Sequence, residues 1–333
     1  MRQTNISVFV PHIGCPHRCT FCDQRTISGE AHAPTPEEVE RTLCDQLPSL
    51  RARGIKAEIA FFGGSFTGID RTYMTALLDT ANAFVQSAPD VYTGIRCSTR
   101  PDLIDDDILD ILCSRGMTAV ELGAQSMNDE VLKLNERGHS SADVERASSL
   151  IKARGLSLGL QMMTGLYGDR PEYCIETARR FISLGADTVR IYPTVILAGT
   201  KLGELYKSGE YRTFSEETTV NLCAGLLRMF DEAGIPVIRL GLHASRDVEE
   251  KMLGGVYHPA LRELCESRIF YEDMLADMQC RGDCRKFIVY TDPSNISKVV
   301  GQKKENKVRL HENGFDFIIK TEKGTRLRIE NAF

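Results

Sequence analysis

Short apolar runs alternate with longer amphipathic segments along most of the chain. This alternation is typical of parallel βα units, in which a buried strand is followed by a helix that packs on the sheet. We expect strands at residues 7–10, 57–62, 93–98, 119–122, 156–161, 188–192 and 237–240. Successive units of this kind predict an α/β fold, namely a partial or complete TIM-type barrel.

The segments between these strands carry the signals of helices. In the first of them Thr35 can cap a helix, Pro36 suits its first turn, and Glu38 completes a capping box. A long helical pattern at 259–278 ends before a change in composition. We therefore expect a barrel domain at 1–278, a linker at 279–285 and a small second unit at 286–333.

Three cysteines follow the first predicted strand with the spacing Cys-x-x-x-Cys-x-x-Cys. In a barrel, the loops after the strands meet at the face that carries the active site. Three thiolates can hold three irons of a 4Fe-4S cluster, which leaves the fourth iron open to a non-protein ligand. The alternative is a zinc site with His17 as its fourth ligand. The three residues are Cys15, Cys19 and Cys22.

This loop resembles the cluster loop of the radical S-adenosylmethionine (SAM) superfamily. Motifs near the ends of later strands are similar to those of the radical SAM domain of the Elongator catalytic subunit, and the agreement extends from residue 7 to about residue 245. The resemblance stops short of the acetyltransferase domain of that subunit, so acetyl-CoA use is not carried over. The motifs are Thr99-Arg100-Pro101-Asp102, Gly123-Ala124-Gln125-Ser126 and Arg137-Gly138-His139, with further matches at 190–194, 199–202 and 208–211.

The resemblance implies a 4Fe-4S cluster and SAM as cofactors. The amino and carboxylate groups of SAM would chelate the fourth iron, and an electron from the cluster would cleave SAM to a 5'-deoxyadenosyl radical. It also implies an electron donor such as a ferredoxin or flavodoxin, and RNA, namely tRNA, as the substrate. The alternatives are a small-molecule substrate such as a tetrapyrrole, and an iron-sulfur or RNA-binding protein without turnover.

Glycines follow the second predicted strand, at Gly63 and Gly64, with Ser65 next. Backbone without side chains lets a ligand approach closely, so these residues are candidates to contact the methionine end of SAM. The superfamily carries a Gly-Gly-Glu-like motif at this point. Ser65 stands in place of its acid, which leaves the backbone contacts as the expected ones.

Five more cofactor-binding residues are implied by the resemblance. Ser98 and Gln161 are expected near the nucleoside, Gln125 and Arg137 near the ribose and the carboxylate, and Phe21 beside the adenine. A guanidinium facing a carboxylate is a strong and geometrically selective pair. The alternatives are that Phe21 belongs to the core and that Arg137 pairs with a helix carboxylate, such as that of Glu130.

Tyr192 is a candidate catalytic residue on the substrate side of the barrel, together with the three cysteines of the cluster loop. His243 and His258 could line the same side. The alternatives are a half-buried packing tyrosine and, for His258, a role in the turn at Pro259.

Eleven cysteines and the absence of an export signal predict thiols or metal ligands in a cytoplasmic protein. No apolar run approaches the ~20 residues that cross a bilayer, so no membrane association is expected. Cys265, Cys280 and Cys284 could form a second metal site, and buried thiols are the alternative.

The C-terminal segment is basic. Residues 285–333 carry 11 Lys and Arg against 6 Asp and Glu, whereas residues 1–284 carry 30 against 40. The pattern strand, helix, Gly301-containing loop, helix, strand, strand resembles a small α+β module of the KH type, whose Gly-x-x-Gly loop clamps RNA backbone. Lys304 stands where the second glycine is expected. RNA binding, without DNA, is one interpretation, and a cap over the open side of the barrel is the other.

Overall fold

The computed structural model describes residues 3–10, 13–16, 18–23, 26, 32–243 and 245–332. Across these residues, seven parallel strands form one sheet in the order β1-β2-β3-β4-β5-β6-β8. All seven predicted strands are confirmed, and most extend beyond their predicted bounds. They are β1 (Gln3–Val10), β2 (Lys56–Gly63), β3 (Tyr92–Thr99), β4 (Met117–Gln125), β5 (Ser157–Thr164), β6 (Thr188–Pro193) and β8 (Val237–Leu240).

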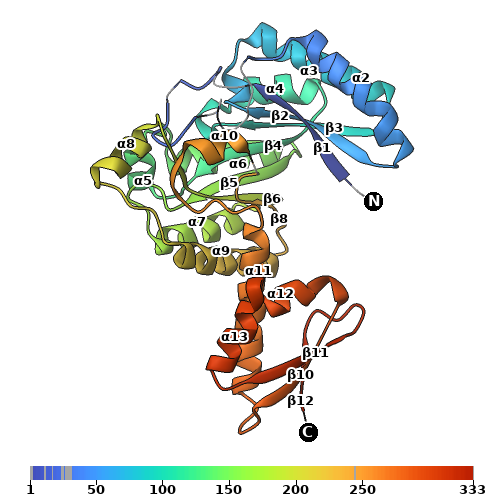
Figure 1. The fold of residues 1–333 in the computed structure, drawn as a ribbon. Coiled ribbons are helices and arrows are strands. Elements are labelled where there is room, and N and C mark those ends of the chain that lie inside the picture. The colour runs from blue at the N-terminus through green and yellow to red at the C-terminus, as the bar shows by residue number, and fades with distance from the viewer. Residues whose placement is uncertain are drawn as a thin grey trace.

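The sheet curls into an open half-barrel whose two edges are β1 and β8 (Figure 1). Within the described ranges these edge strands pair with one neighbour each and not with one another. Of the two predicted forms, the partial TIM-type barrel is therefore the one that this chain adopts. Because all strands run in parallel, their C-terminal ends lie at one face, where loops of distant sequence meet.

Helices cover the outer face of this sheet (Figure 1). The first begins at the predicted capping box, since the Thr35 hydroxyl accepts from the Glu38 amide and the Glu38 carboxylate accepts from the Thr35 amide. Leu43, Leu78 and Leu109 bring the helices' apolar faces into the core and are completely buried. The helices are α2 (Pro36–Ala52), α3 (Arg71–Ser87), α4 (Asp106–Ser114), α6 (Ser141–Ala153), α7 (Pro171–Ser183) and α9 (Glu216–Glu232).

Shorter elements lie in the connections that follow the strands. They are α5 (Asp129–Leu134), α8 (Lys201–Ser208), α10 (Arg246–Lys251) and an antiparallel pair formed by β7 (Val195–Leu197) and β9 (Met252–Gly255). The sequence does not indicate this pair, because a strand of three or four residues is too short to show a period. None of the helices in the described ranges is both long and apolar enough to cross a membrane.

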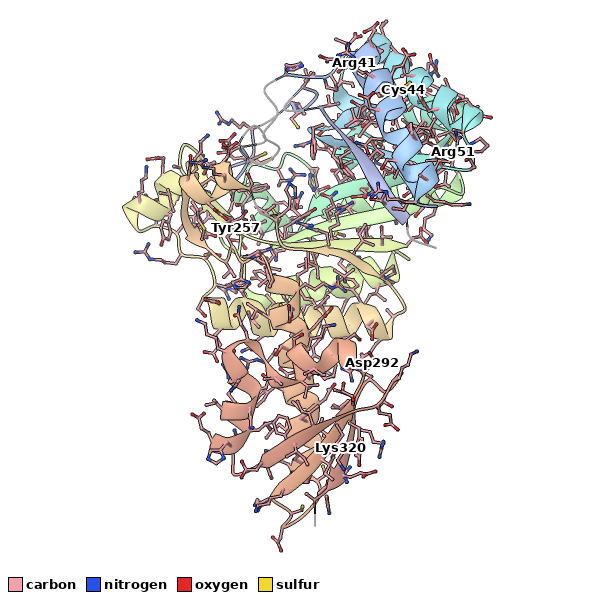
Figure 2. All side chains as sticks on the ribbon, turned by 45° about the vertical axis from the view of Figure 1, so that its right-hand side comes forward. Arg41, Cys44, Arg51, Tyr257, Asp292 and Lys320 are labelled. Atoms are coloured by element: carbon pink, nitrogen blue, oxygen red, sulfur yellow. The ribbon has the colours of Figure 1, made fainter. Side chains whose placement is uncertain are left out.

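The C-terminal segment forms a small α+β unit in the predicted order of elements. Within residues 286–331, β10 (Lys286–Thr291) lies at the centre of a sheet, parallel to β11 (Asp316–Thr321) and antiparallel to β12 (Arg328–Asn331). Two helices, α12 (Ile296–Val300) and α13 (Glu305–Glu312), connect β10 to β11. Figure 2 shows the side chains of this unit, with Lys320 on its sheet. Its relation to KH modules stays a prediction.

A long helix, α11 (Leu261–Gln279), joins the two units. Near its start, Cys265 belongs to the core of the barrel. Farther along, Phe270, Met274 and Met278 pack into a second core with residues of β10, α12, α13, β11 and β12. The predicted division at 279–285 stays a prediction, and α11 supplies side chains to the cores on both sides of it.

Candidate active site

The cysteine loop opens into a cavity of about 610 Å³ at the C-terminal ends of the strands. All three cysteines of the loop line it. So do all eight residues that the sequence predicted to bind the cofactor, which come from the loop and from the ends of β2, β3, β4 and β5 and from the segment after α5. These residues are Phe21, Gly63, Gly64, Ser65, Ser98, Gln125, Arg137 and Gln161. His17 lies outside the described residues.

Backbone and side-chain hydrogen bonds hold the loop against the barrel. The Thr20 amide donates to the Asn135 carbonyl at 3.2 Å and its hydroxyl donates to the Asn135 side chain at 3.0 Å. The Thr20 carbonyl accepts from the Leu202 amide at 2.8 Å. Gly14 has a φ of +90°, and a Cβ there would lie 2.5 Å from the Ser65 carbonyl oxygen. The loop therefore fits closely only because this residue is glycine.

Arg137 links the cysteine loop to β4. Its Nη1 donates to Cys19 Sγ at 3.0 Å and its Nη2 donates to the Gly123 carbonyl at 2.5 Å. The predicted alternative, a pair with a helix carboxylate, is not among its hydrogen bonds in the described residues. The guanidinium places positive charge beside a sulfur whose thiolate is the metal-binding form. Arg137, a residue that is 6 % exposed, is thus held at the cysteine loop by two bonds.

Besides the Arg100 Nη1, two buried polar atoms in the cavity wall have no hydrogen-bond partner within the described residues. They are the Arg137 Nε, a donor, and the Gln125 Oε1, an acceptor. Gln125 also has a φ of 66°, a left-handed conformation that costs a non-glycine residue energy. Buried polar groups in proteins are nearly always paired. An orphaned donor and acceptor at one cavity fit a ligand with both anionic and hydrogen-bonding groups, as SAM has.

The glycine turn after β2 is more constrained than the sequence suggested. Gly63 has a φ of +113°, and a Cβ there would lie 2.9 Å from the Val10 carbonyl oxygen. The Gly64 amide donates to that same carbonyl at 2.8 Å, so this amide is used within the fold. Ser65 is buried, and its Oγ lies 3.4 Å from Cys15 Sγ. Ser65 therefore contacts the cysteine loop directly.

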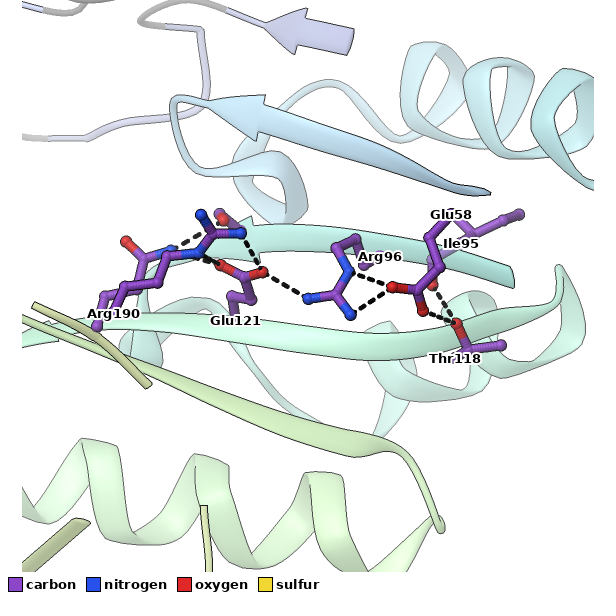
Figure 3. Close-up of polar contacts among 8 residues, drawn as sticks. Glu58, Ile95, Arg96, Thr118, Glu121 and Arg190 are labelled. Carbon is purple, nitrogen blue, oxygen red and sulfur yellow. Dashed lines mark hydrogen bonds and ion pairs between the residues drawn. The ribbon is translucent and has the colours of Figure 1, made fainter. Parts of the chain in front are cut away.

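A row of alternating charges crosses the inner face of the sheet below the cavity (Figure 3). Arg96 on β3 donates to Glu58 on β2 and, at 2.7 Å, to Glu121 on β4. Glu121 also accepts two bonds from Arg190 on β6, at 2.6 and 2.9 Å. Gln161 donates to Glu121 at 2.9 Å and to Ser98 at 3.1 Å. The row thereby sets the orientation of two predicted cofactor residues.

The sequence does not by itself indicate this row or the part that several further residues take in the cavity wall. Arg18, Thr99 and Arg100 line the cavity as well. Arg100 is 3 % exposed, and it pairs with Asp102 through two bonds of 2.9 Å. The charged residues among these could have been found from the sequence by their positions inside or directly after an apolar strand. A buried charge needs a partner or a ligand, so such a position indicates one or the other.

Comparison with known proteins identifies the family. The sequence profile of the radical SAM superfamily matches residues 9–181, about half of the chain. The chain belongs to the radical SAM superfamily. A radical SAM C-terminal domain also matches, at residues 186–270. This chain is therefore a radical SAM enzyme, and the cofactors of that family are a 4Fe-4S cluster and SAM.

Several relatives are similar over most of this radical SAM chain. It is 26% identical over 291 residues to a tRNA uridine(34) acetyltransferase of Dehalococcoides mccartyi. The aligned region covers 78% of this chain and 62% of that protein. It is 30% identical over 229 residues to an uncharacterized protein of Methanocaldococcus jannaschii, covering 65% and 68%. It is 27% identical over 302 residues to Elongator complex protein 3 of Saccharomyces cerevisiae, covering 78% and 53%.

A solved structure has the same fold. The structure of an archaeal Elp3 from Methanocaldococcus infernus superposes with a TM-score of 0.62 at 22% identity, covering 85% of this chain and 66% of that one. This chain therefore spans about half to two thirds of the length of the relatives it matches.

The three cysteines of this radical SAM chain all line the cofactor cavity. Among the described residues, no three His, Cys, Asp or Glu side chains lie close enough to hold a single metal ion. In a cluster each cysteine binds a different iron, so the sulfurs need not converge on one point. The cavity that all three line fits this arrangement.

The other three cysteines considered from the sequence lie apart from one another. Cys265 is completely buried in the barrel core, where its contact with Cys223, together with burial, raises the pKa of the Cys223 thiol. Cys284 packs at the second core and Cys280 is exposed. These positions agree with buried or surface thiols, and no group of three metal-binding side chains occurs there in the described residues.

Of the three residues predicted on the substrate side of the radical SAM barrel, two line one cavity and the third lies elsewhere. Tyr192 and His243 line a second cavity that adjoins the first. His258 does not line it among the described residues. Its Nδ1 accepts from the Ala260 amide at 3.1 Å, which agrees with a role in the local turn. Burial raises the pKa of Tyr192 despite the opposing effect of Arg190, so its hydroxyl is neutral at pH 7.

His139, next to the Arg137 segment, should make the protein less stable in acid. Burial, and next the charge of Arg137, lower its pKa to about 4, from a usual value of about 6.5. Between these values the unfolded chain binds a proton that the folded chain does not. Stability is therefore lost as pH falls through this window, by up to about 3 kcal/mol at its lower end.

Urea unfolding at several pH values between about 7 and 4 tests this in the wild type and in His139→Gln. The variant should lose part of the pH dependence of the free energy of unfolding. His32→Gln, at an exposed position, is the control and should match the wild type. Equal pH profiles for His139→Gln and the wild type would show that His139 is not held neutral by the fold.

Proposed function

We propose that this chain is a radical SAM enzyme that modifies tRNA. The observation that supports it is a cavity lined by three cysteines and eight predicted cofactor residues, in a chain with relatives named as tRNA uridine(34) acetyltransferases. The relatives' names belong to longer proteins, so tRNA as the substrate of this chain is part of the proposal.

The residues of the cavity divide into two tasks. Cys15, Cys19 and Cys22 would each bind one iron of the cluster, and Arg137 would steady Cys19 through the bond of 3.0 Å. The free donor of Arg137 and the free acceptor of Gln125 would bind polar groups of SAM. Bound there, cluster and SAM supply a carbon radical that abstracts hydrogen from the substrate or adds to it.

Other side chains orient and enclose the site. Ser98 and Gln161 are held by the charged row, which keeps their polar groups fixed at the cavity wall. Phe21 packs in a small apolar cluster with Ile196, Leu202 and Tyr211 and lines both cavities. We assign it the border between cofactor and substrate, where an apolar ring excludes water. Tyr192 would contact the substrate as a neutral hydroxyl.

The decisive experiment measures 5'-deoxyadenosine after anaerobic reconstitution with iron, sulfide, SAM and dithionite. It is run with and without bulk tRNA. We expect tRNA to stimulate 5'-deoxyadenosine formation, and ribonuclease treatment of the tRNA to remove the effect. Formation that tRNA does not change would point to a small-molecule substrate instead. No formation at all would leave a binding protein without turnover.

The C-terminal unit is proposed to bind the tRNA. The loop between α12 and α13 presents Lys303 and Lys304, and Lys307 follows on α13. All three are exposed and form no ion pair among the described residues. Lys304 has a φ of 66°, so the loop keeps the left-handed backbone of a glycine position although a lysine occupies it. Exposed lysines of this kind can contact phosphates without competition from carboxylates.

The variant Lys303→Ala/Lys304→Gly tests this surface and preserves the backbone that position 304 requires. We expect weaker binding to bulk tRNA. The slope of log K against log salt concentration should be smaller in magnitude by about 1 to 2, because fewer phosphate contacts release fewer counterions on binding. Filter binding at two or more salt concentrations measures the slope. Lys207→Ala, at an exposed lysine of α8, is the control. An unchanged slope in the double variant would contradict RNA binding by this loop.

A cytoplasmic location and an electron donor such as a ferredoxin or flavodoxin complete the proposal. Thiolate-bound clusters and free thiols suit a reducing compartment.

A further inference from the structure

The second cavity adjoins the cofactor cavity and has a volume of about 350 Å³. Phe21, Cys22 and Gln161 are among the residues that line both. From there it extends across the open side of the half-barrel, between Ser7 on β1 and Arg239 on β8. A molecule in this cavity would therefore lie next to the cluster loop.

The basic side chains in the lining of this cavity are two arginines. Among the described residues the lining contains Arg190 and Arg239 and no aspartate or glutamate. Arg190 is compensated, because two of its nitrogens donate to the buried carboxylate of Glu121. Phe62 lies under its guanidinium, 5.1 Å from the ring centroid. The charge of Arg190 is thus used within the fold.

Arg239 has no such partner. It is the register neighbour of Arg190 on the adjacent strand, and its side chain is half-buried. In the described residues its hydrogen bond goes to a neutral acceptor, the Gly241 carbonyl, from Nε at 2.8 Å. No ion pair forms with it there. The two terminal nitrogens, which suit a bidentate contact, are not used by a carboxylate of the fold.

Among the described residues, two titratable groups of the cavity lining are close enough to respond to Arg239, and neither carries a negative charge. The neighbouring Tyr192 is neutral at pH 7 because burial raises its pKa. His243 is neutral as well, since burial and the charge of Arg239 lower its pKa. A partly buried cation without an anion is costly for the fold, so a ligand that completes the pair would gain the energy of a charged hydrogen bond.

We propose that the substrate carries an anionic group, a phosphate or a carboxylate, and that Arg239 binds it at the β8 side of the second cavity. Tyr192 and His243 offer hydrogen bonds to the same group. The anion would hold the substrate at the wall while the reacting part faces the cysteine loop. This rests on the proposed function, in that it names the chemistry that the enzyme recognises in its substrate.

Chemical labelling tests the site without turnover. The full-length reconstituted protein is treated with phenylglyoxal, which reacts with accessible guanidinium groups, and labelling at each arginine is measured by peptide mass spectrometry. Arg239 should react faster than Arg190, which is held by Glu121. Inorganic phosphate, acetate and tRNA are then added separately as protecting probes.

The probes distinguish the two sources of the anion. Protection of Arg239 by phosphate and tRNA indicates a substrate phosphate, and protection by acetate alone indicates a carboxylate. Either result supports the site. Labelling of Arg239 that none of the probes slows would overturn it. Because labelling needs no turnover, a failure of tRNA to stimulate 5'-deoxyadenosine formation would refute the proposed function and leave this test intact.

Variants give a second measure. Arg239→Gln should raise the KM for tRNA in the 5'-deoxyadenosine assay roughly 10- to 100-fold, because a charged hydrogen bond is lost. Arg239→Lys should recover part of the lost affinity. Iron and sulfide content should equal that of the wild type, so that the change is not due to cluster loss. Arg246→Gln, at an exposed arginine on α10, is the control and should behave as wild type. Equal KM values for Arg239→Gln and wild type would contradict the site.

Discussion

Replacement of Glu121 by alanine is expected to destabilise the folded protein by about 3 to 5 kcal/mol. The side chain is 1 % exposed and lies between two guanidinium groups (Figure 3). Without it, Arg96 loses one of its two carboxylate partners and Arg190 loses its only one among the described residues. The cost arises because a buried charge without a partner is far less stable than the intact pair.

Urea unfolding with circular dichroism measures this difference. The control is Asp90→Ala, which removes an exposed carboxylate that pairs with Arg51 at 2.7 Å; Figure 2 labels that arginine. Its loss should cost at most about 1 kcal/mol, since solvent screens such a pair. If both variants cost the same, the row of charges does not stabilise the barrel.

Acid should weaken the same row. Burial raises the pKa of Glu121, but Arg190 and Arg96 together outweigh burial and lower it below the usual value. The folded protein therefore holds this carboxylate charged at a pH where the unfolded chain has begun to take up a proton. The stability that Glu121 contributes is present above its unfolded pKa and is lost as pH falls through the lower folded value.

Replacement of Cys19 by alanine is expected to abolish 5'-deoxyadenosine formation, by about 1,000-fold or more. Cys19 is the most deeply buried cysteine of the loop and accepts the hydrogen bond from Arg137. With two cysteine ligands left, the cluster would lose one of its three protein anchors and bind iron poorly. Iron, sulfide and 5'-deoxyadenosine are measured after the same anaerobic reconstitution.

The control for this variant is Cys44→Ala, which changes an exposed cysteine on α2 that is not among the residues lining the cofactor cavity; Figure 2 labels it. It should retain wild-type iron and activity. Circular dichroism of Cys19→Ala should match the wild type, so that loss of iron is not due to unfolding. Full iron content in Cys19→Ala, or stoichiometric zinc and no iron in the wild type, would contradict the cluster assignment.

The strands and the residues that line the cofactor cavity could be predicted from the sequence for one physical reason. A parallel sheet is buried on both faces, so its strands appear as apolar runs between helices, and strand ends then gather at one face. Gly63 and Gln125 follow or end such runs. Knowing which loops follow which strands was therefore sufficient to bring distant residues to one cavity.

Side-chain contacts between different strands and helices of the barrel could not be predicted from the order of strands and loops. That Arg96 lies between Glu58 and Glu121 depends on strand register, and register is not visible in one sequence. The same holds for Cys265, whose neighbour is Cys223 on another helix rather than Cys280 or Cys284. Likewise, the use of the Gly64 amide by Val10 follows from the close approach of two strand ends.

The shared helix α11 has a consequence for dissecting the molecule. Its later turns face away from the barrel core and supply Phe270, Met274 and Met278 to the other core. A barrel fragment that ends at residue 279 would expose these three apolar side chains to water. A C-terminal fragment that begins after residue 279 would lack the same three side chains in its core. Because each half depends on side chains of the shared helix, we expect heat to unfold both in a single cooperative step.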